Sequence, residues 1–186
     1  MLISESSADE PPLRTFPRSH KLRKRVETWF ALGKFQRILC ERTGELGQCN
    51  KTVEQRIHQC GGRPAWGWLI VFWPRLYVEA LYHCAWRSPD GRLIDLSKKY
   101  PGDLSTFSTF VCDETHDAGY DKPSRYFTIS ERLEVKALIS AAEDEIETRR
   151  NLLRICKVQG RLPTDLELAL LWKLRRRVEY CIDACR

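Results

Sequence analysis

The 186-residue sequence lacks several features that would place it in a common class of protein. It has no apolar run of the roughly 18 residues that cross a membrane. Its first residues, MLISESSADEPPL, lack the basic start and apolar core of a secretory signal. It also has no P-loop and no Gly-x-Gly-x-x-Gly, so nucleotide cofactors have no support. These absences favour a cytoplasmic protein that has no membrane segment and no cofactor.

The sequence also lacks any Cys-x-x-Cys, although it contains 8 cysteines. They are spread through apolar stretches, and without an export signal we expect reduced thiols rather than a disulfide framework. The sequence has a few pairs of His and Cys residues that come close to a metal-binding motif, but none has the spacing of a structural zinc site. They are His58-Gln59-Cys60, His83-Cys84, and Cys112 with His116. A metal site is therefore an alternative that we do not favour.

Charge and composition are those of an ordinary globular protein, with 30% charged and 42% hydrophobic residues. The length fits one core with a helical extension. Much of the net charge of +6 comes from basic clusters at Lys21–Arg25 and Lys173–Arg177. Such runs on amphipathic helices are usually solvated faces, so nucleic-acid binding is an alternative but is not favoured.

One stretch, Trp66 to Leu96, combines dense β-forming residues with candidate catalytic residues. Its composition predicts three antiparallel strands. They are Trp66–Trp73, Leu76–Arg87 and Arg92–Leu96. The second and third are joined by Ser88-Pro89-Asp90-Gly91, where Pro presets φ and Gly accepts a positive φ.

This turn sets which side chains meet. With a three-residue loop, Ser88 faces Arg92 and Ala85 faces Asp95. Asp95 and His83 then share a face as diagonal neighbours, within reach of an imidazole and a carboxylate. A loop one residue longer would move Asp95 to the opposite face.

The segments on either side of this sheet are predicted from caps and periodicity. We expect a disordered arm over 1–16, a helix from an N-cap at Ser19 to Gly33, and a second helical stretch from Phe35 to about Arg42. A short helix should follow over Cys49–Cys60, stopped by Gly61-Gly62. Beyond the three strands, Thr106–Cys112 and Arg125–Thr128 are predicted to be further strands, with 113–124 irregular.

Two long helices joined through Gly160 should form an antiparallel hairpin over 128–186. Thr128 with Glu131, and Thr164 with Glu167, have capping-box spacing. The apolar stripes that we predict are Val135, Ile139, Ala142, Ile146 and Leu153 on the first helix, and Leu171, Leu174, Val178, Cys181 and Cys185 on the second. The predicted class is α+β, with N-terminal helices and a small antiparallel sheet in a core over 17–127 and the hairpin packed on it.

Three residues could form a thiol active site. Cys49 falls at the start of its predicted helix, where unpaired N–H groups and the helix dipole favour a thiolate. His83, with Asp95 behind it on the next strand, would supply a base and its orienting carboxylate. Each has a plainer explanation: Cys49 shares a helix face with Val53 and could be an inert thiol, His83 could be a core histidine, and Asp95 could cap a turn.

The same residues carry a resemblance to a family of enzymes. The motifs are Gln48-Cys49, His83-Cys84-Ala85-Trp86 and Gly91-Arg92-Leu93-Ile94-Asp95. Over residues 48–97 the chain resembles the transglutaminase-like and papain-like cysteine enzymes, which place the nucleophile at a helix start and the histidine and acid on the following antiparallel strands. It departs from the transglutaminase-like pattern where Cys84 follows His83 and where Leu96-Ser97 replaces Pro-Thr. The stretch is also similar to a group of uncharacterised bacterial proteins with a Glu-Ala-x-x-His-x-x-Trp strand.

The resemblance implies roles for particular residues. Cys49 would be the nucleophile, His83 the general base and acid, and Asp95 the group that orients His83. Gln48, Glu79 and Trp86 would lie toward the substrate, Gln48 beside the oxyanion site, where the backbone N–H of Cys49 is the safer donor.

We therefore favour a cysteine-dependent hydrolase or acyl-transferase that forms an acyl-enzyme on Cys49 with a protein or peptide substrate. The alternative is a non-catalytic interaction protein that binds a protein or nucleic acid through the hairpin and the basic clusters. The hairpin could also join two copies of the chain. A contact between the Cys49 sulfur and the His83 ring would discriminate between the enzyme and the interaction protein.

Overall fold

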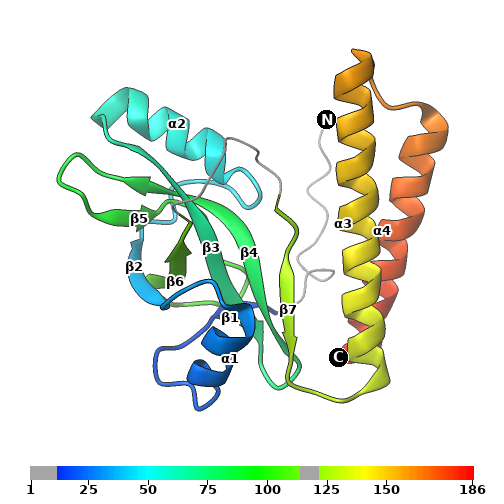
Figure 1. The fold of residues 1–186 in the computed structure, drawn as a ribbon, viewed down its shortest axis with the longest axis horizontal. Helices are drawn as coiled ribbons and strands as arrows, with labels where there is room; N and C mark the ends of the chain where they lie inside the picture. The colour runs from blue at the N-terminus through cyan, green and yellow to red at the C-terminus, as the bar shows by residue number, and fades with distance from the viewer. Residues whose placement is uncertain (1–11, 114–121) are drawn as a thin grey trace. The chain divides into compact units, whose positions relative to one another are not determined.

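The computed structural model describes residues 12–113 and 122–186, which divide into two units, Pro12–Ile129 and Ser130–Arg186 (Figure 1). Most of the predicted N-terminal arm and most of the predicted irregular segment 113–124 lie outside the described residues. The first unit holds helices α1 (Arg23–Phe30) and α2 (Cys49–Cys60). Its strands are β1 (Arg14–Thr15), β2 (Gln36–Cys40), β3 (Arg63–Trp73), β4 (Tyr77–Arg87), β5 (Leu93–Asp95), β6 (Phe107–Cys112) and β7 (Arg125–Thr128).

The sheet closes on itself. Its order is β1-β3-β6-β2-β5-β4-β7, and β3 also pairs with β4, so β3, β6, β2, β5 and β4 form a ring. The α+β class is confirmed, and the three strands predicted between Trp66 and Leu96 are present as β3, β4 and β5. The sheet is mixed rather than wholly antiparallel, because β2 runs parallel to β5, with Leu39 opposite Ile94.

The turn between β4 and β5 has the predicted three-residue loop. The Ser88 N–H donates to the Arg92 carbonyl at 2.9 Å, and the Gly91 N–H donates to the Ser88 carbonyl at 2.8 Å. Gly91 has a φ of 85°, which glycine adopts without strain. The register is Trp86 opposite Ile94 and Arg87 opposite Leu93, which confirms the predicted alignment.

The interior of the ring is filled by side chains from strands that are far apart in sequence. Ile38 on β2, Ala85 on β4 and Phe110 on β6 pack together, and all three are buried. Gly67 on β3 provides the room for Phe110, because a Cβ at Gly67 would lie 2.5 Å from the Phe110 Cζ atom. On the other side of the sheet, α1 contributes Val26 and Phe30 to a second buried cluster.

We expect Gly67→Ala to destabilise the protein by about 3 kcal/mol or more. The added Cβ would lie 2.1 Å from the Val111 carbonyl oxygen, which belongs to the backbone of the neighbouring strand and cannot move without breaking the β3–β6 pairing. Urea unfolding measures the change. Gly102→Ala is the control, because its Cβ would meet nothing within 4 Å and only its φ of 81° is unfavourable, costing roughly 1–2 kcal/mol. Equal losses in the two variants would contradict the packing argument.

Three predictions in the first unit are wrong. Residues 12–16 do not belong to a disordered arm, because Arg14 pairs with Phe72 and Phe16 is fully buried. The predicted helix from Phe35 is strand β2, held on one side by β6 and on the other by β5. Helix α1 begins after Leu22 rather than at a Ser19 cap, and it ends at Phe30 with Ala31 in the left-handed conformation.

The second unit is the predicted helical hairpin, formed by α3 (Leu133–Gln159) and α4 (Asp165–Cys185). Thr164 makes the predicted capping box with Glu167. The capping box predicted at Thr128 is wrong, because Thr128 ends β7 opposite Tyr77. On α4 the buried residues include three predicted ones, Val178, Cys181 and Cys185. On α3, Val135 is buried as predicted, but the rest of the predicted stripe is not the buried face. The other buried residues are Leu138, Ala141, Glu145, Leu152 and Cys156, several of which precede a predicted position by one residue.

In the part of the chain that the structure describes, no helix is both long and apolar enough to cross a bilayer. The predicted packing of the hairpin on the core stays a prediction.

Candidate active site

Cys49 occupies the first position of α2, with Gln48 as its N-cap. Its side chain is half-buried and lies close enough to His83 for the imidazole to lower the pKa of the thiol. Burial alone would raise the pKa of the Cys49 thiol, but the hydrogen bond to His83, the charge of that ring, and backbone hydrogen bonds at Cys84 and Asn50 outweigh it and lower the pKa. The Cys49 thiol and the His83 ring each change the pKa of the other, which the enzyme interpretation requires.

His83 is the centre of the site. It lies on β4, and its Nε2 atom is 3.0 Å from the Asp95 Oδ1 atom on β5, a buried contact. Because Nε2 faces Asp95, Nδ1 is left for the Cys49 thiol. Burial by itself would lower the pKa of His83, yet the Asp95 carboxylate and then the Cys49 thiolate raise it well above its ordinary value. A raised histidine pKa beside a lowered thiol pKa favours a thiolate–imidazolium pair.

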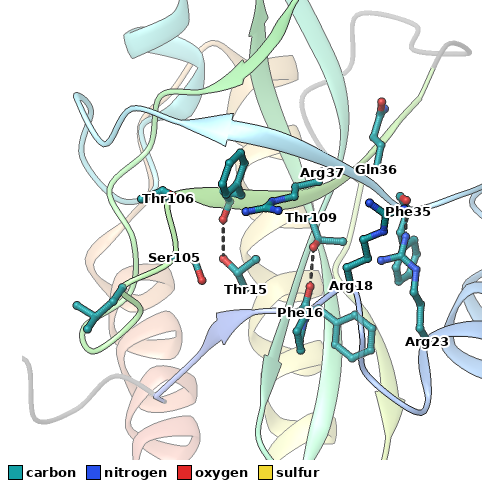
Figure 2. Close-up of a pocket in the computed structure, with 13 residues that line it drawn as sticks. Thr15, Phe16, Arg18, Arg23, Phe35, Gln36, Arg37, Ser105, Thr106 and Thr109 are labelled. Carbon is teal, nitrogen blue, oxygen red and sulfur yellow. Dashed lines mark hydrogen bonds between the residues drawn. The ribbon is translucent and has the colours of Figure 1, made fainter.

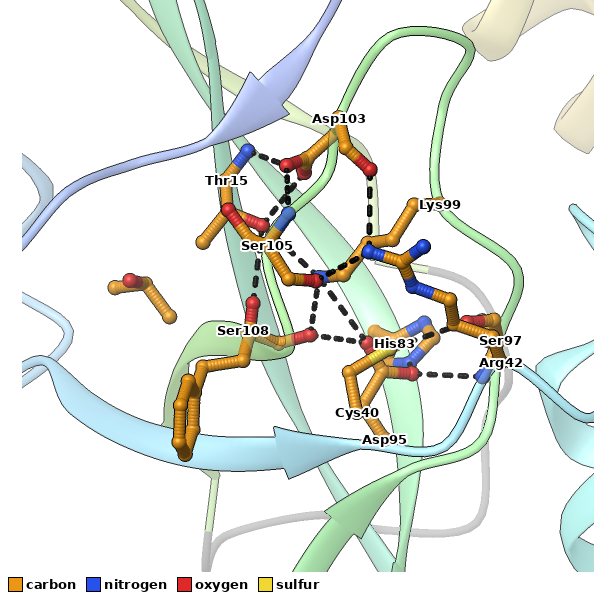
Figure 3. Close-up of polar contacts among 12 residues, drawn as sticks. Thr15, Cys40, Arg42, His83, Asp95, Ser97, Lys99, Asp103, Ser105 and Ser108 are labelled. Atoms are coloured by element: carbon orange, nitrogen blue, oxygen red, sulfur yellow. Dashed lines mark hydrogen bonds and ion pairs between the residues drawn. The ribbon is translucent and has the colours of Figure 1, made fainter.

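Asp95 is held as a carboxylate by groups on every side (Figure 3). Its Oδ1 atom accepts from His83 and from the Ser97 N–H at 2.9 Å, and its Oδ2 atom accepts from the Ser108 hydroxyl on β6. Burial would raise the pKa of Asp95, but His83, Ser108 and Ser97 lower it below its ordinary range. The carboxylate is thus charged and fixed toward the ring.

A buried lysine stands behind this carboxylate. Lys99 Nζ lies 3.9 Å from the Asp95 Oδ2 atom and donates to the Ser108 hydroxyl at 2.6 Å. It also donates to the Thr15 hydroxyl on β1 at 2.9 Å, and Thr15 in turn donates to Asp103. Sequence reasoning missed Lys99 and Ser108. Their only sequence signal is that Lys99 follows Asp95 by four residues.

The residues predicted to lie toward the substrate are not all brought to the site. Gln48 is exposed at the start of α2, next to Cys49. Trp86 is buried beneath α2 in a cluster with Val53 and Ile94, and its Nε1–H donates to the Gly61 carbonyl at 2.9 Å, so it has a packing role instead.

Glu79 does not line an open groove, because it is buried on β4 opposite Tyr126. Burial raises the pKa of Glu79 to about 7, against the opposing effect of hydrogen bonds to Ser124 and Tyr126. These contacts make it part of the β4–β7 pairing rather than of the site around Cys49.

An aromatic pair beside the site was not predicted. Trp66 and Tyr82 are both half-buried, and their rings stack with centroids 5.7 Å apart and an interplanar angle of 14°. Trp66 packs against the same apolar cluster as Cys49, and it lies opposite Cys84, the neighbour of His83. The sequence signal of the pair, aromatic residues on neighbouring strands, is common to core positions and could not single it out.

The other thiols differ from Cys49. All 8 cysteines are free. Burial is the main cause that raises the pKa of Cys40, Cys84 and Cys185. Among the residues that the structure describes, no group of three or more His, Cys, Asp or Glu side chains could hold a metal ion. His116, one of the ligands considered from sequence, lies outside those residues.

Comparison with known proteins adds no assignment: no family model, no curated protein and no solved structure matches this chain.

Proposed function

We propose that this protein is a cysteine-dependent hydrolase or acyl-transferase that forms an acyl-enzyme on Cys49. The observation that carries the proposal is the buried contact between His83 and Asp95 together with the mutual effect of Cys49 and His83, which lowers the pKa of the thiol and raises the pKa of the imidazole. Nucleophile, base and orienting acid in contact are the requirements for thiol catalysis. The same order of elements, helix start then adjacent strands, is what the transglutaminase-like and papain-like resemblance implies.

The chemistry follows from the charges. The Cys49 thiolate attacks the carbonyl carbon of an amide or thioester and forms a C–S bond, with the carbonyl electron pair moving to oxygen. As that tetrahedral species collapses, the bond to the leaving group breaks and His83 donates its proton to the departing nitrogen or sulfur. Water or an amine then attacks the thioester carbon, and the neutral His83 takes a proton from this attacking group. The C–S bond breaks, and Cys49 leaves as a thiolate. Water gives hydrolysis and an amine gives acyl transfer.

The start of α2 supplies the groups that this reaction needs at the carbonyl oxygen. First-turn N–H groups of a helix have no partner within the helix, and the helix dipole favours negative charge there. The backbone N–H of Cys49 is one such group, so it would donate to the oxyanion, with the Gln48 side chain beside it. Asp95 keeps His83 in the orientation in which Nδ1 faces the thiol.

Substrate and location are also part of the proposal. Trp66 is half-buried, stacks on Tyr82 and packs against the same apolar cluster as Cys49, and such aromatic surroundings fit a protein or peptide substrate. A cytoplasmic location is consistent with the 8 free cysteines, because thiols stay reduced there.

Acylation by p-nitrophenyl acetate at pH 6 tests the proposal. We expect one acetyl group per chain on the peptide that contains Cys49, found by mass spectrometry, together with release of nitrophenol. The label should vanish in Cys49→Ser and form roughly 100-fold or more slowly in His83→Ala, because a positioned base contributes about 10²–10⁴-fold. Cys60→Ser is the matched control, since Cys60 is exposed at the far end of the same helix. Equal labelling of Cys49 and Cys60 would overturn the assignment.

A contact between two copies of the hairpin is a second candidate function. Leu162 in the α3–α4 connection and Leu166 in the first turn of α4 are 86% and 82% exposed, and Trp172 further along α4 is 68% exposed. Exposed apolar groups that gather in this way mark interaction sites. The basic cluster on α4 favours nucleic acid less, because Arg175 and Arg176 pair with Glu179 and Arg177 pairs with Asp144.

If the hairpin joins two copies, light scattering should give the mass of a dimer. Leu162→Lys combined with Leu166→Lys should shift the equilibrium to monomer, because two lysines would have to be buried in the contact. Leu133→Lys is the control, since Leu133 is 79% exposed at the other end of α3. A wild-type monomer at high concentration would contradict this second function and leave the first untouched.

A further inference from the structure

A cavity of about 970 Å³ lies in the first unit (Figure 2). Its walls come from β1 and the segment that follows it, from the start of β2, and from β6 with the loop that precedes it. Among the residues that line it are none of the Cys49, His83 and Asp95 set. The volume is at the upper end of the roughly 300–1,000 Å³ of small-molecule sites, so it exceeds what a single inorganic ion would fill.

The charged residues that line the cavity are all arginines. They are Arg18, Arg23 and Arg37, and no aspartate or glutamate is found among the described lining residues. Arg23 has structural contacts, since it pairs with Glu27 at 3.1 Å and donates to the Phe35 carbonyl. The cavity therefore has a positive wall that no carboxylate within it neutralises.

Arg37 and Arg18 are the guanidinium groups open to a ligand. The Arg37 guanidinium lies over the Phe107 ring, with its central carbon 3.3 Å from the ring centroid. That contact restrains the guanidinium, and its N–H groups remain donors for an acceptor. Arg18 is exposed on the segment after β1 and makes no hydrogen bond or ion pair with the described part of the chain.

The two carboxylates that contact lining residues have other partners. Glu27 pairs with Arg23 and accepts from the Phe35 N–H at 3.0 Å, and Asp103 is buried and accepts from the Thr15 N–H at 2.8 Å and from the Ser105 N–H at 3.0 Å. Neither carboxylate pairs with Arg18 or Arg37 in the described part of the chain. The buried rings of Phe16 and Phe35 form apolar wall beside these arginines.

We propose that this cavity binds a small anion that carries several phosphate groups. A planar guanidinium presents paired N–H donors that match phosphate oxygens, and two such groups around one volume match an anion with more than one phosphate. The site is separate from the thiol chemistry, so its occupation does not depend on the proposed function.

Isothermal titration of the full chain with sodium tripolyphosphate, at constant ionic strength, tests this inference. We expect one binding site per chain. Arg37→Gln and Arg18→Gln should each weaken binding by at least about tenfold, since each removes charge-assisted hydrogen bonds. Arg18 lies on an exposed segment, so its replacement leaves folding intact even if the Arg37 variant unfolds.

Lys24→Gln is the matched control. Lys24 is exposed on α1 next to Arg23 and does not line the cavity, so the substitution changes net charge equally and should leave the affinity within about twofold. Absence of binding, equal weakening by Lys24→Gln, or equally tight binding of citrate would each overturn the proposal, the last because citrate offers carboxylates instead of phosphates.

Discussion

Iodoacetamide at pH 6 should modify Cys49 at least about tenfold faster than Cys60, the exposed thiol at the other end of α2. An ordinary thiol with a pKa near ~8.5 is below about 1% thiolate at this pH, and the thiolate is the form that reacts. The pKa of Cys49 is lowered by His83 and by backbone hydrogen bonds at the helix start. Mass spectrometry of the two peptides over time gives both rates in one sample.

His83→Ala should remove this preference. Burial is the largest influence on Cys49 and raises its pKa, so without the imidazole the thiol becomes less acidic and reacts no faster than Cys60. Asp95→Asn should weaken the preference less, because the amide still holds the ring but no longer favours the imidazolium. As pH rises toward ~8.5, where an ordinary thiol ionises, the ratio should fall, because the lowered pKa of Cys49 then gives it a smaller advantage. A ratio that stays near one at pH 6 would show that Cys49 is an inert thiol.

The contact between His83 and Asp95 could be predicted because it depends on one short turn. Ser88-Pro89-Asp90-Gly91 fixes a three-residue loop, and the alternation of side chains then places His83 and Asp95 on one face. The bounds of α2 could be predicted for a similar reason, since the apolar spacing along the helix and the glycines that end it are local features of the sequence. Structure that depends only on neighbouring residues can be predicted from a single sequence.

Strand β2 could not be predicted, because its five residues are too few to distinguish the 3.6-residue period of a helix from the two-residue alternation of a strand. Phe35, Ile38 and Leu39 have helical spacing, yet Ile38 and Cys40 are buried and Leu39 is exposed, which is a strand alternation. The strand forms because β5 and β6 pair with it, and both lie more than fifty residues later in the chain. The same limit hid the support of Asp95, since Thr15, Lys99 and Ser108 meet only once β1 and β6 are placed.

The aromatic pair and Trp86 show a related limit. Tyr82 and Trp86 lie on β4 together with His83, and Trp66 lies on the neighbouring strand β3. Their residue types give no indication of which ring is covered by α2. Only the placement of Val53 over Trp86 decides that Trp86 is core. The surroundings of a site are therefore harder to predict than the site itself.

Asp95→Ala should destabilise the fold by about 3–5 kcal/mol, the usual cost of removing one partner of a buried ion pair. It leaves His83 without its buried acceptor and Lys99 without its buried counter-charge, and it takes away the oxygen atoms to which Ser108 and the Ser97 N–H donate. Glu54→Ala, an exposed carboxylate on α2, is the control and should change stability by no more than about 0.5 kcal/mol. Urea unfolding of the two variants and the wild type measures these differences.

The loss in Asp95→Ala should also depend on pH. The pKa of Asp95 is lowered in the fold, so its contribution is present above about pH 4, the ordinary value, and is lost as pH falls through the lowered pKa. The pKa of His83 is raised, so its contribution is complete below about pH 6.5 and declines as pH rises toward the raised pKa. Both are present between these limits, and the difference between wild type and Asp95→Ala should therefore be larger at pH 5 than at pH 8. In the variant, burial without a counter-charge disfavours the imidazolium, which widens the difference at pH 5. A difference that is larger at pH 8 would mean that His83 is neutral in the fold and that the thiolate–imidazolium pair does not form.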